Sequence, residues 1–270
     1  MLPPLREVIA RHGLDARRSL GQHFLLDGNL TARIARCAGD LAGRQVIEVG
    51  PGPGGLTRAL LESAAAGVTA IEVDPRAVAA IRELAETDAR LLVVDSDAVG
   101  MDLAALVPAP RVIVANLPYN VATPLLVGWL RQAAAFERLV LMFQLEVAER
   151  ICAVPGTAAY GRLSVLAQFV CEVSLALRIP PTAFVPPPNV FSAVVAFVPH
   201  AIQKEAVLLA AMERVTAAAF GQRRKMLRGA LKRLGGEGLL DRAGIAGDRR
   251  AETLSVAEFE RLARLTAAVG

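Results

Sequence analysis

The stretch QVIEVGPGPGGLT, at Gln45–Thr57, decides the fold class of this 270-residue chain. Its first five residues are largely apolar and predict a buried β-strand. Glycines then recur at Gly50, Gly52 and Gly54, where they allow sharp turns and let the backbone approach a ligand closely. Apolar residues resume at helical spacing from Leu56. A strand, a glycine-rich turn and a helix in this order predict a Rossmann-like α/β fold with a ligand at the carboxyl end of the strand.

Further strands and helices alternate along the chain after this unit. The expected strands are 67–74, 90–97, 110–120 and 137–144, and the expected helices between the first of them are 56–66 and 76–86. Such alternation predicts right-handed βαβ units and a mostly parallel sheet. The segments 163–179 and 191–200 are rich in β-forming residues and predict an antiparallel pair at one edge.

The composition changes after Pro199. The segments 204–220, 222–234 and 255–269 all show helical periodicity, and Ser255 with Glu258 fits a capping box. The prediction is an α/β domain over residues 1–199, which includes a basic N-terminal extension at 1–22, and a small all-α domain over 200–270.

The overall composition excludes several classes of protein. Hydrophobic residues make up 54% of the chain, yet no uninterrupted apolar run reaches the ~18 residues of a membrane-spanning helix. A parallel sheet buried on both faces explains this hydrophobicity. The N-terminus lacks the pattern of a secretory signal, and Cys37, Cys152 and Cys171 have no metal-binding spacing. We therefore expect reduced core thiols, no metal site, no membrane association and a cytoplasmic location.

Acidic residues mark the ends of the second and third expected strands. Glu72 can accept hydrogen bonds from a ribose diol, and Asp97 suits the exocyclic amine of an adenine. A glycine-rich turn of this kind serves both NAD and S-adenosylmethionine (SAM). Pro51 and Pro53 remove N–H donors that a pyrophosphate would need, which favours SAM. An NAD-linked oxidoreductase also lacks an obvious catalytic Tyr-x-x-x-Lys or His–Asp pair.

The fourth expected strand ends in Asn116-Leu117-Pro118-Tyr119. The Asn116 side chain and the Leu117 carbonyl could both accept hydrogens from an adenine amine, and Pro118 would fix the backbone between them. Tyr119 offers a ring on which the base can stack. The pattern favours an amide clamp with a stacking platform, although a plain strand-terminating turn is the alternative. Phe143, at the end of the fifth strand, is a weaker candidate for stacking on the other face of the base, and core packing is its alternative.

The basic residues are unevenly distributed. Residues 200–270 contain 13 Lys and Arg against 8 Asp and Glu, whereas the whole chain has a net charge of +4. The candidates for contact with RNA phosphates are Arg17, Arg18, Arg223, Arg224, Lys225, Arg228 and Lys232. We expect residues 222–234 to form one packed helix with a cationic outer side. A solvated charged face and a membrane-surface helix are the alternatives.

These motifs together resemble the ribosomal RNA adenine dimethyltransferase family, and within it the branch that acts on the bacterial small subunit. The resemblance covers nearly the whole chain and is carried by SLGQHFLLD, VIEVGPGPGGLT, AIEVDPR, ANLPYN, LMFQLEVAERI, AYGRLSVLAQ, PPPNVFSAVV and AFGQRRKMLR. It implies SAM as cofactor and four methyl transfers to two adjacent adenosines in the 3′-terminal hairpin of 16S rRNA, inside the small (30S) subunit or its precursor.

The resemblance also places roles on individual residues. It implies cofactor contacts at His23, Leu25, Gly50, Glu72, Asp97 and Asn116, and a target-base site at Asn116 and Tyr119. Departures from the family pattern are His23 in place of Asn, Ser96 in place of Gly, and Leu145 and Asn189 in place of Lys. A non-enzymatic assembly factor on the methylase scaffold is the alternative function, and a monomer is expected.

Overall fold

The computed structural model describes residues 2–14, 23–222 and 225–267, which form two compact units. The first unit comprises Met1–Ala148 and Ser174–Val198, and the second comprises Glu149–Val173 and Pro199–Gly270. The sequence-based division at residue 199 was therefore wrong for Glu149–Val173. This segment belongs to the second unit because its helix α7 (Arg162–Val170) packs against α8 (Ala206–Phe220).

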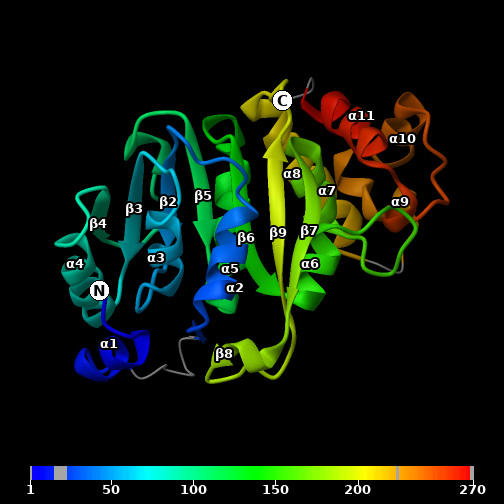
Figure 1. Ribbon diagram of the computed structural model, residues 1–270. Helices are drawn as coiled ribbons and strands as arrows, with labels where there is room; N and C mark the ends of the chain where they lie inside the picture. Colours follow the sequence, from blue (N-terminus) through cyan, green and yellow to red (C-terminus); the bar gives the residue numbers. More distant parts are fainter. Residues whose placement is uncertain (1, 15–22, 223–224, 268–270) are drawn as a thin grey trace. The chain divides into compact units, whose positions relative to one another are not determined.

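The first unit is built on a seven-stranded sheet (Figure 1). Its strands are β2 (Gln45–Val49), β3 (Gly67–Glu72), β4 (Leu91–Asp95), β5 (Arg111–Ala115), β6 (Arg138–Gln144), β7 (Cys171–Ile179) and β9 (Ser192–Pro199). Their order in the sheet is β4-β3-β2-β5-β6-β9-β7. The pairs from β4 to β6 are parallel, and β9 runs antiparallel to β6. The order reverses next to β2, so the carboxyl ends of β2 and β5 flank the crevice where such sheets bind ligands.

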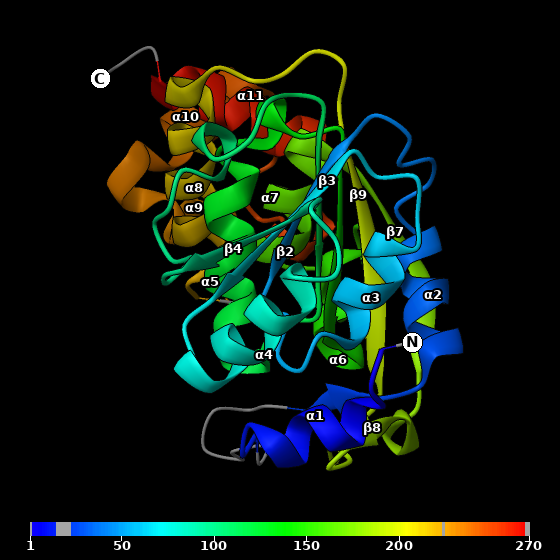
Figure 2. The same ribbon diagram turned by 60° about the vertical axis from the view of Figure 1, so that its left-hand side comes forward.

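Helices cover both faces of this sheet (Figure 2). The helices of the first unit are α1 (Leu5–Arg11), α2 (Gly28–Arg36), α3 (Gly55–Leu61), α4 (Pro75–Ala85) and α5 (Tyr119–Leu130), and α6 (Leu145–Ile151) leads into the second unit. Alternate strand residues such as Val46 and Val112 pack against α2, α3 and α4 in one apolar cluster. Their neighbours Ile47 and Ile113 point to the opposite face and are equally buried. This double burial explains the near-continuous hydrophobic strands.

A short antiparallel pair lies beside the glycine-rich turn. It is formed by β1 (Phe24–Leu25) and β8 (Phe184–Val185), which lie far apart in the sequence. A Cβ on Gly55 would come within 2.5 Å of the Leu25 carbonyl oxygen, so only glycine allows β1 to approach the start of α3 this closely.

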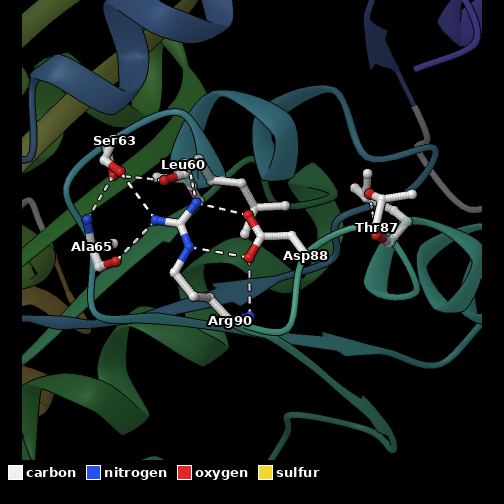
Figure 3. A network of polar contacts seen from close by, with 8 residues as sticks. Leu60, Ser63, Ala65, Thr87, Asp88 and Arg90 are labelled. Atoms are coloured by element: carbon white, nitrogen blue, oxygen red, sulfur yellow. Dashed lines mark hydrogen bonds and ion pairs between the residues drawn. The ribbon is translucent and has the colours of Figure 1, made fainter. Parts of the chain in front are cut away.

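The Arg90 side chain links two loops at the amino-terminal edge of the sheet (Figure 3). Its Nε and Nη2 bind the Asp88 carboxylate at 3.1 and 2.7 Å. Its Nη1 donates to the carbonyls of Ser63 and Ala65 at 3.3 and 3.2 Å. These bonds join the connection between α3 and β3 to the turn before β4, and so hold the two strands in register.

The expected strand 163–179 is only half correct. Its first part forms α7, because Leu163, Leu166 and Val170 recur at helical spacing. Its second part forms β7, in which the burial of successive residues alternates.

The second unit is helical around an apolar core. Beyond α7 and α8 it contains α9 (Leu227–Ala230), α10 (Gly236–Ala243) and α11 (Val256–Ala267). The Phe220 ring stacks on Phe259 with centroids 5.5 Å apart and meets the edge of Tyr160 at 6.2 Å. The capping box at Ser255 is confirmed, because the Ser255 N–H donates to Glu258 and the Glu258 N–H donates to the Ser255 hydroxyl.

The expectation of one helix over 222–234 was wrong. Within its described part, this segment forms only the single turn α9 and a 3₁₀ turn at Lys232–Leu234. Leu227 and Leu231 are fully buried, as their spacing predicts, but α9 ends at Ala230, and Gly235 with a φ of 115° ends the 3₁₀ turn that follows.

No helix among the described residues combines the length and hydrophobicity that crossing a membrane requires.

Candidate active site

A cavity of about 630 Å³ opens at the carboxyl ends of β2, β3 and β5 in the first unit. It gathers residues from segments that lie up to a hundred positions apart. Of the residues expected to bind the cofactor or the target base, those lining it are His23, Leu25, Gly50, Gly52, Glu72, Asp97, Asn116, Leu117, Pro118 and Tyr119. The volume is typical of sites for small molecules and cofactors.

The glycine-rich turn forms one wall of the cavity. Gly50, Gly52 and Gly54 have φ angles of 70°, 54° and 89°, which side-chain-bearing residues rarely adopt. Gly50 and Gly52 line the cavity, whereas Gly54 lies outside it as the N-cap residue of α3, where an added Cβ would lie 3.0 Å from the Ile81 side chain. Gly54 therefore shapes the turn from outside the cavity.

Glu72 connects this turn to the end of β3. One carboxylate oxygen accepts hydrogen bonds from the N–H groups of Val73 and Asp74 at 2.8 and 2.9 Å. The other accepts from the Gly52 N–H at 3.2 Å. Since a carboxylate has about four acceptor positions, Glu72 can hold the turn in place and still accept hydrogens from a ribose.

Replacing Gly52 with alanine is expected to weaken SAM binding roughly 5- to 30-fold. The left-handed φ would cost about 1–2 kcal/mol, and the new Cβ would lie 3.2 Å from the Phe24 ring. Gly43→Ala is the matched control, because Gly43 has a φ of 73° but open space around it. Calorimetric titration with SAM measures the effect, and equal losses of affinity in both variants would contradict it.

The cavity lining is strongly acidic. It includes Glu48, Glu72, Asp74 and Asp97 but only one Lys or Arg among the described residues, Arg76. Arg76 binds the Asp74 carboxylate with two hydrogen bonds, from Nε at 3.0 Å and from Nη2 at 2.6 Å. An excess of carboxylates fits a cationic ligand and disfavours a pyrophosphate.

Glu48 is a lining residue to which the sequence motifs assigned no role. It lies in β2 with 1% of its surface exposed, and its Oε2 has no hydrogen-bond partner in the described part of the chain. Burial, and to a smaller extent the neighbouring Glu72 carboxylate, raises the pKa of Glu48 to about 8. An acid inside an otherwise apolar strand was the signal that could have revealed it.

Glu48→Gln is expected to make the free energy of unfolding depend less on pH. Between the ordinary pKa of 4.5 and about 8, the unfolded chain loses the Glu48 proton while the folded chain keeps it, so the stability of the folded state falls as pH rises. Between pH 6 and pH 8 the wild type should lose about 2 kcal/mol more stability than the variant.

The fluorescence of Trp129 provides the measurement. Trp129 is the single tryptophan of the chain and is 2% exposed in α5, so urea unfolding followed by its emission reports on the first unit. Exposed Glu62→Gln serves as the control. Parallel pH profiles for the wild type and Glu48→Gln would contradict the prediction.

The Asn116 side chain has a defined orientation at the end of β5. Its Nδ2 donates to the backbone carbonyl of His23 at 3.4 Å. Because a carbonyl can only accept, this contact assigns the amide nitrogen and leaves Oδ1 as the free acceptor. In the described chain, no backbone N–H donates to the neighbouring Leu117 carbonyl. Two acceptors are thus available side by side.

Tyr119 is positioned by two residues from distant segments. Its hydroxyl lies 2.6 Å from the Ser192 hydroxyl at the start of β9, and its ring centre lies 5.6 Å from that of His23. Burial raises the pKa of Tyr119, and the bond to Ser192 partly offsets this effect. His23 is held in turn by its Nδ1, which donates to the Pro186 carbonyl at 2.8 Å. Ser192 and Pro186 were not expected from the sequence, since the contacts that define them span many residues.

The remaining expected site residues lie elsewhere. Phe143 is 1% exposed, packs edge-on against Phe197 with centroids 6.3 Å apart and does not line the cavity, which favours core packing. Lys225, Arg228 and Lys232 are exposed in the second unit. The other basic candidates, namely Arg17, Arg18, Arg223 and Arg224, lie outside the described residues.

Comparisons with known proteins bear on this geometry. The family model for ribosomal RNA adenine dimethylase matches residues 13–268. The chain belongs to this family. Ribosomal RNA small subunit methyltransferase A of Gluconobacter oxydans is 65% identical over 99% of this chain and 88% of the relative. The corresponding protein of Paramagnetospirillum magneticum is 60% identical over 97% and 94%.

Two solved structures of other methyltransferases share the fold. A dimethyladenosine transferase from Plasmodium falciparum superposes with a TM-score of 0.74 at 24% identity, over 89% of this chain and 96% of its own. The 23S rRNA methyltransferase ErmE superposes with a TM-score of 0.67 at 28% identity, over 89% and 98%. The prediction of a Rossmann-like methyltransferase sheet is therefore confirmed.

Adenine dimethylases of this family are SAM-dependent methyltransferases, so SAM is the cofactor of this enzyme. Its cavity fits that cofactor. The acidic lining suits a positively charged nucleoside, and the unpartnered Glu48 oxygen marks a polar position that a ligand can complete.

Proposed function

We propose that this enzyme is a 16S rRNA (adenine-N6)-dimethyltransferase. Its substrates are two adjacent adenosines in the 3′-terminal hairpin loop of 16S rRNA, each of which receives two methyl groups within the small (30S) subunit or its precursor. It acts as a monomer in the cytoplasm and takes part in small-subunit biogenesis. The relatives named for small-subunit rRNA methylation, at 60–65% identity, support this substrate.

One observation carries the catalytic part of the proposal: the Asn116 amide is oriented so that Oδ1 and the Leu117 carbonyl remain free at the edge of an acidic nucleoside cavity. SAM, when bound in this cavity, would supply an electrophilic methyl group. The two acceptors take hydrogen bonds from the adenine amine, so that its nitrogen lone pair is directed toward the cavity. Positioning of this kind is the main contribution the residues make.

The Tyr119 ring stacks on the target base after the base leaves its own stack. Its hydroxyl is bound to Ser192, which restricts rotation of the ring before the base arrives. A hairpin loop is a suitable substrate because its bases are easier to extrude than those of a duplex. The proton that the methylated amine loses passes to water, so no strong general base is required.

Radiolabelled methyl transfer tests the proposal. Small subunits that lack the hairpin modification are incubated with the enzyme and labelled SAM, and the labelled nucleotides are mapped. We expect four methyl groups per subunit on two neighbouring adenosines. Label on large-subunit RNA instead, which is the substrate named for ErmE, would overturn the assignment.

The exposed basic residues of the second unit are expected to bind rRNA phosphates. Arg228→Ala combined with Lys232→Ala should weaken binding to small subunits. It should also reduce the slope of log affinity against log salt by roughly 2, because binding neutralises fewer phosphates and therefore releases fewer counterions. The control is Arg242→Ala with Arg250→Ala, a pair equally exposed in the same unit. Identical slopes for the two double variants would exclude a specific RNA-binding surface at Arg228 and Lys232.

A further inference from the structure

Glu48 has no part in the amide clamp or the stacking platform, yet it lines the same cavity. It is 1% exposed, and its Oε2 lies without a hydrogen-bond partner among the described residues. A buried polar atom without a partner is costly, so its presence beside a ligand cavity points to a group that the ligand completes.

Within residues 2–14, 23–222 and 225–267, the charged and titratable groups that line the cavity provide no positive partner for Glu48. Glu72, on the neighbouring strand β3, is the carboxylate that acts on it, and Thr57 approaches from α3. The other titratable groups of the cavity lining are Asp74, Arg76, Asp97, His23 and Tyr119. Arg76 is already bound to Asp74, so the electrostatic potential that the described lining residues produce at Glu48 is negative.

Such an environment favours the neutral form of Glu48 while the cavity holds only water. Burial and the neighbouring carboxylate both disfavour a second negative charge. A cation in the cavity reverses this balance, since an opposite charge nearby favours the ionised form. SAM carries a sulfonium cation, and its demethylated product S-adenosylhomocysteine does not.

We propose that Glu48 is a proton-coupled cation-binding group of the cofactor site, which is a neutral acid in the free protein and ionises when SAM binds. In this step the carboxyl O–H bond breaks, its electron pair stays on the carboxylate oxygen, and the proton passes to solvent. The carboxylate then stabilises the cationic cofactor more than the uncharged thioether of the product. Glu48 thus contributes to the preference for SAM over its product.

Calorimetry measures the proton directly. SAM is titrated into the full chain at pH 7 in phosphate and in Tris, whose ionisation enthalpies differ, and the difference in heat gives the number of protons released. We expect the wild type to release roughly 0.5–1 proton more than Glu48→Gln, since most of a group with a pKa of about 8 is protonated at pH 7. Binding of S-adenosylhomocysteine to the wild type should release a smaller fraction of a proton than binding of SAM does.

A matched variant and a pH series complete the test. Glu62→Gln makes the same change on an exposed side chain outside the cavity and should behave as the wild type does. From pH 6 to pH 7.5 the wild-type affinity for SAM should rise several-fold more than that of Glu48→Gln. Equal proton release in the wild type and a folded Glu48→Gln variant would overturn the proposal.

Infrared difference spectroscopy on the wild type tests the same step if Glu48→Gln does not fold. Addition of SAM should remove the carbonyl stretch of a protonated carboxylic acid, and an unchanged band would contradict ionisation. All these measurements use the cofactor without RNA. A negative result therefore rejects the role of Glu48 alone, whereas failure of the rRNA assignment would show only in methyl transfer to small subunits.

Discussion

Asn116→Ala is expected to lower methyl transfer to undermethylated small subunits roughly 100- to 1,000-fold. The substitution removes Oδ1, the acceptor that orients the adenine amine, and it also removes the hydrogen bond from Nδ2 to the His23 carbonyl. Single-turnover transfer of labelled methyl groups, with saturating SAM, measures the loss.

Folding and cofactor binding must be checked in the same variant. Asn116 is only partly buried, so urea unfolding read by Trp129 should change little. SAM affinity should fall much less than the transfer rate does. Asn29→Ala, an exposed Asn on α2, is the matched control. A wild-type rate of methyl transfer in a folded Asn116→Ala protein would contradict the proposed role of the amide clamp.

Tyr119→Ala is expected to reduce kcat/KM for small subunits roughly 5- to 150-fold, which corresponds to a stacking contribution of about 1–3 kcal/mol. Tyr119→Phe keeps the ring and loses only the bond to Ser192. Its effect on transfer should therefore be below about fivefold, with a loss of about 0.5–1.5 kcal/mol in stability.

Ser192→Ala separates the two roles of Tyr119. It removes the same hydrogen bond from the other side, so it should match Tyr119→Phe in both stability and transfer. Steady-state kinetics on small subunits and urea unfolding supply the two readings. If Tyr119→Phe lost as much activity as Tyr119→Ala, the hydroxyl rather than the ring would carry the function.

The local sequence pattern was sufficient to predict the central elements of the fold. The strand at Gln45–Val49, the glycine-rich turn and the polar group after β5 follow from residue spacing alone. The reason is physical: the periodicity of an apolar run and the left-handed φ of a glycine are determined within a few residues of the chain. The resemblance carried by these motifs agrees with the family that the comparisons show.

Only the tertiary structure determined the side-chain orientations and the burial that depend on residues distant in the sequence. The orientation of Asn116 requires the His23 carbonyl, the position of Tyr119 requires Ser192, and the burial of Glu48 requires the helices packed over β2. Segment 149–173 looked like part of the sheet domain, yet its helix packs within the second unit. Hydrogen bonds and burial between remote segments exist only once the chain has folded, so no local pattern encodes them by itself.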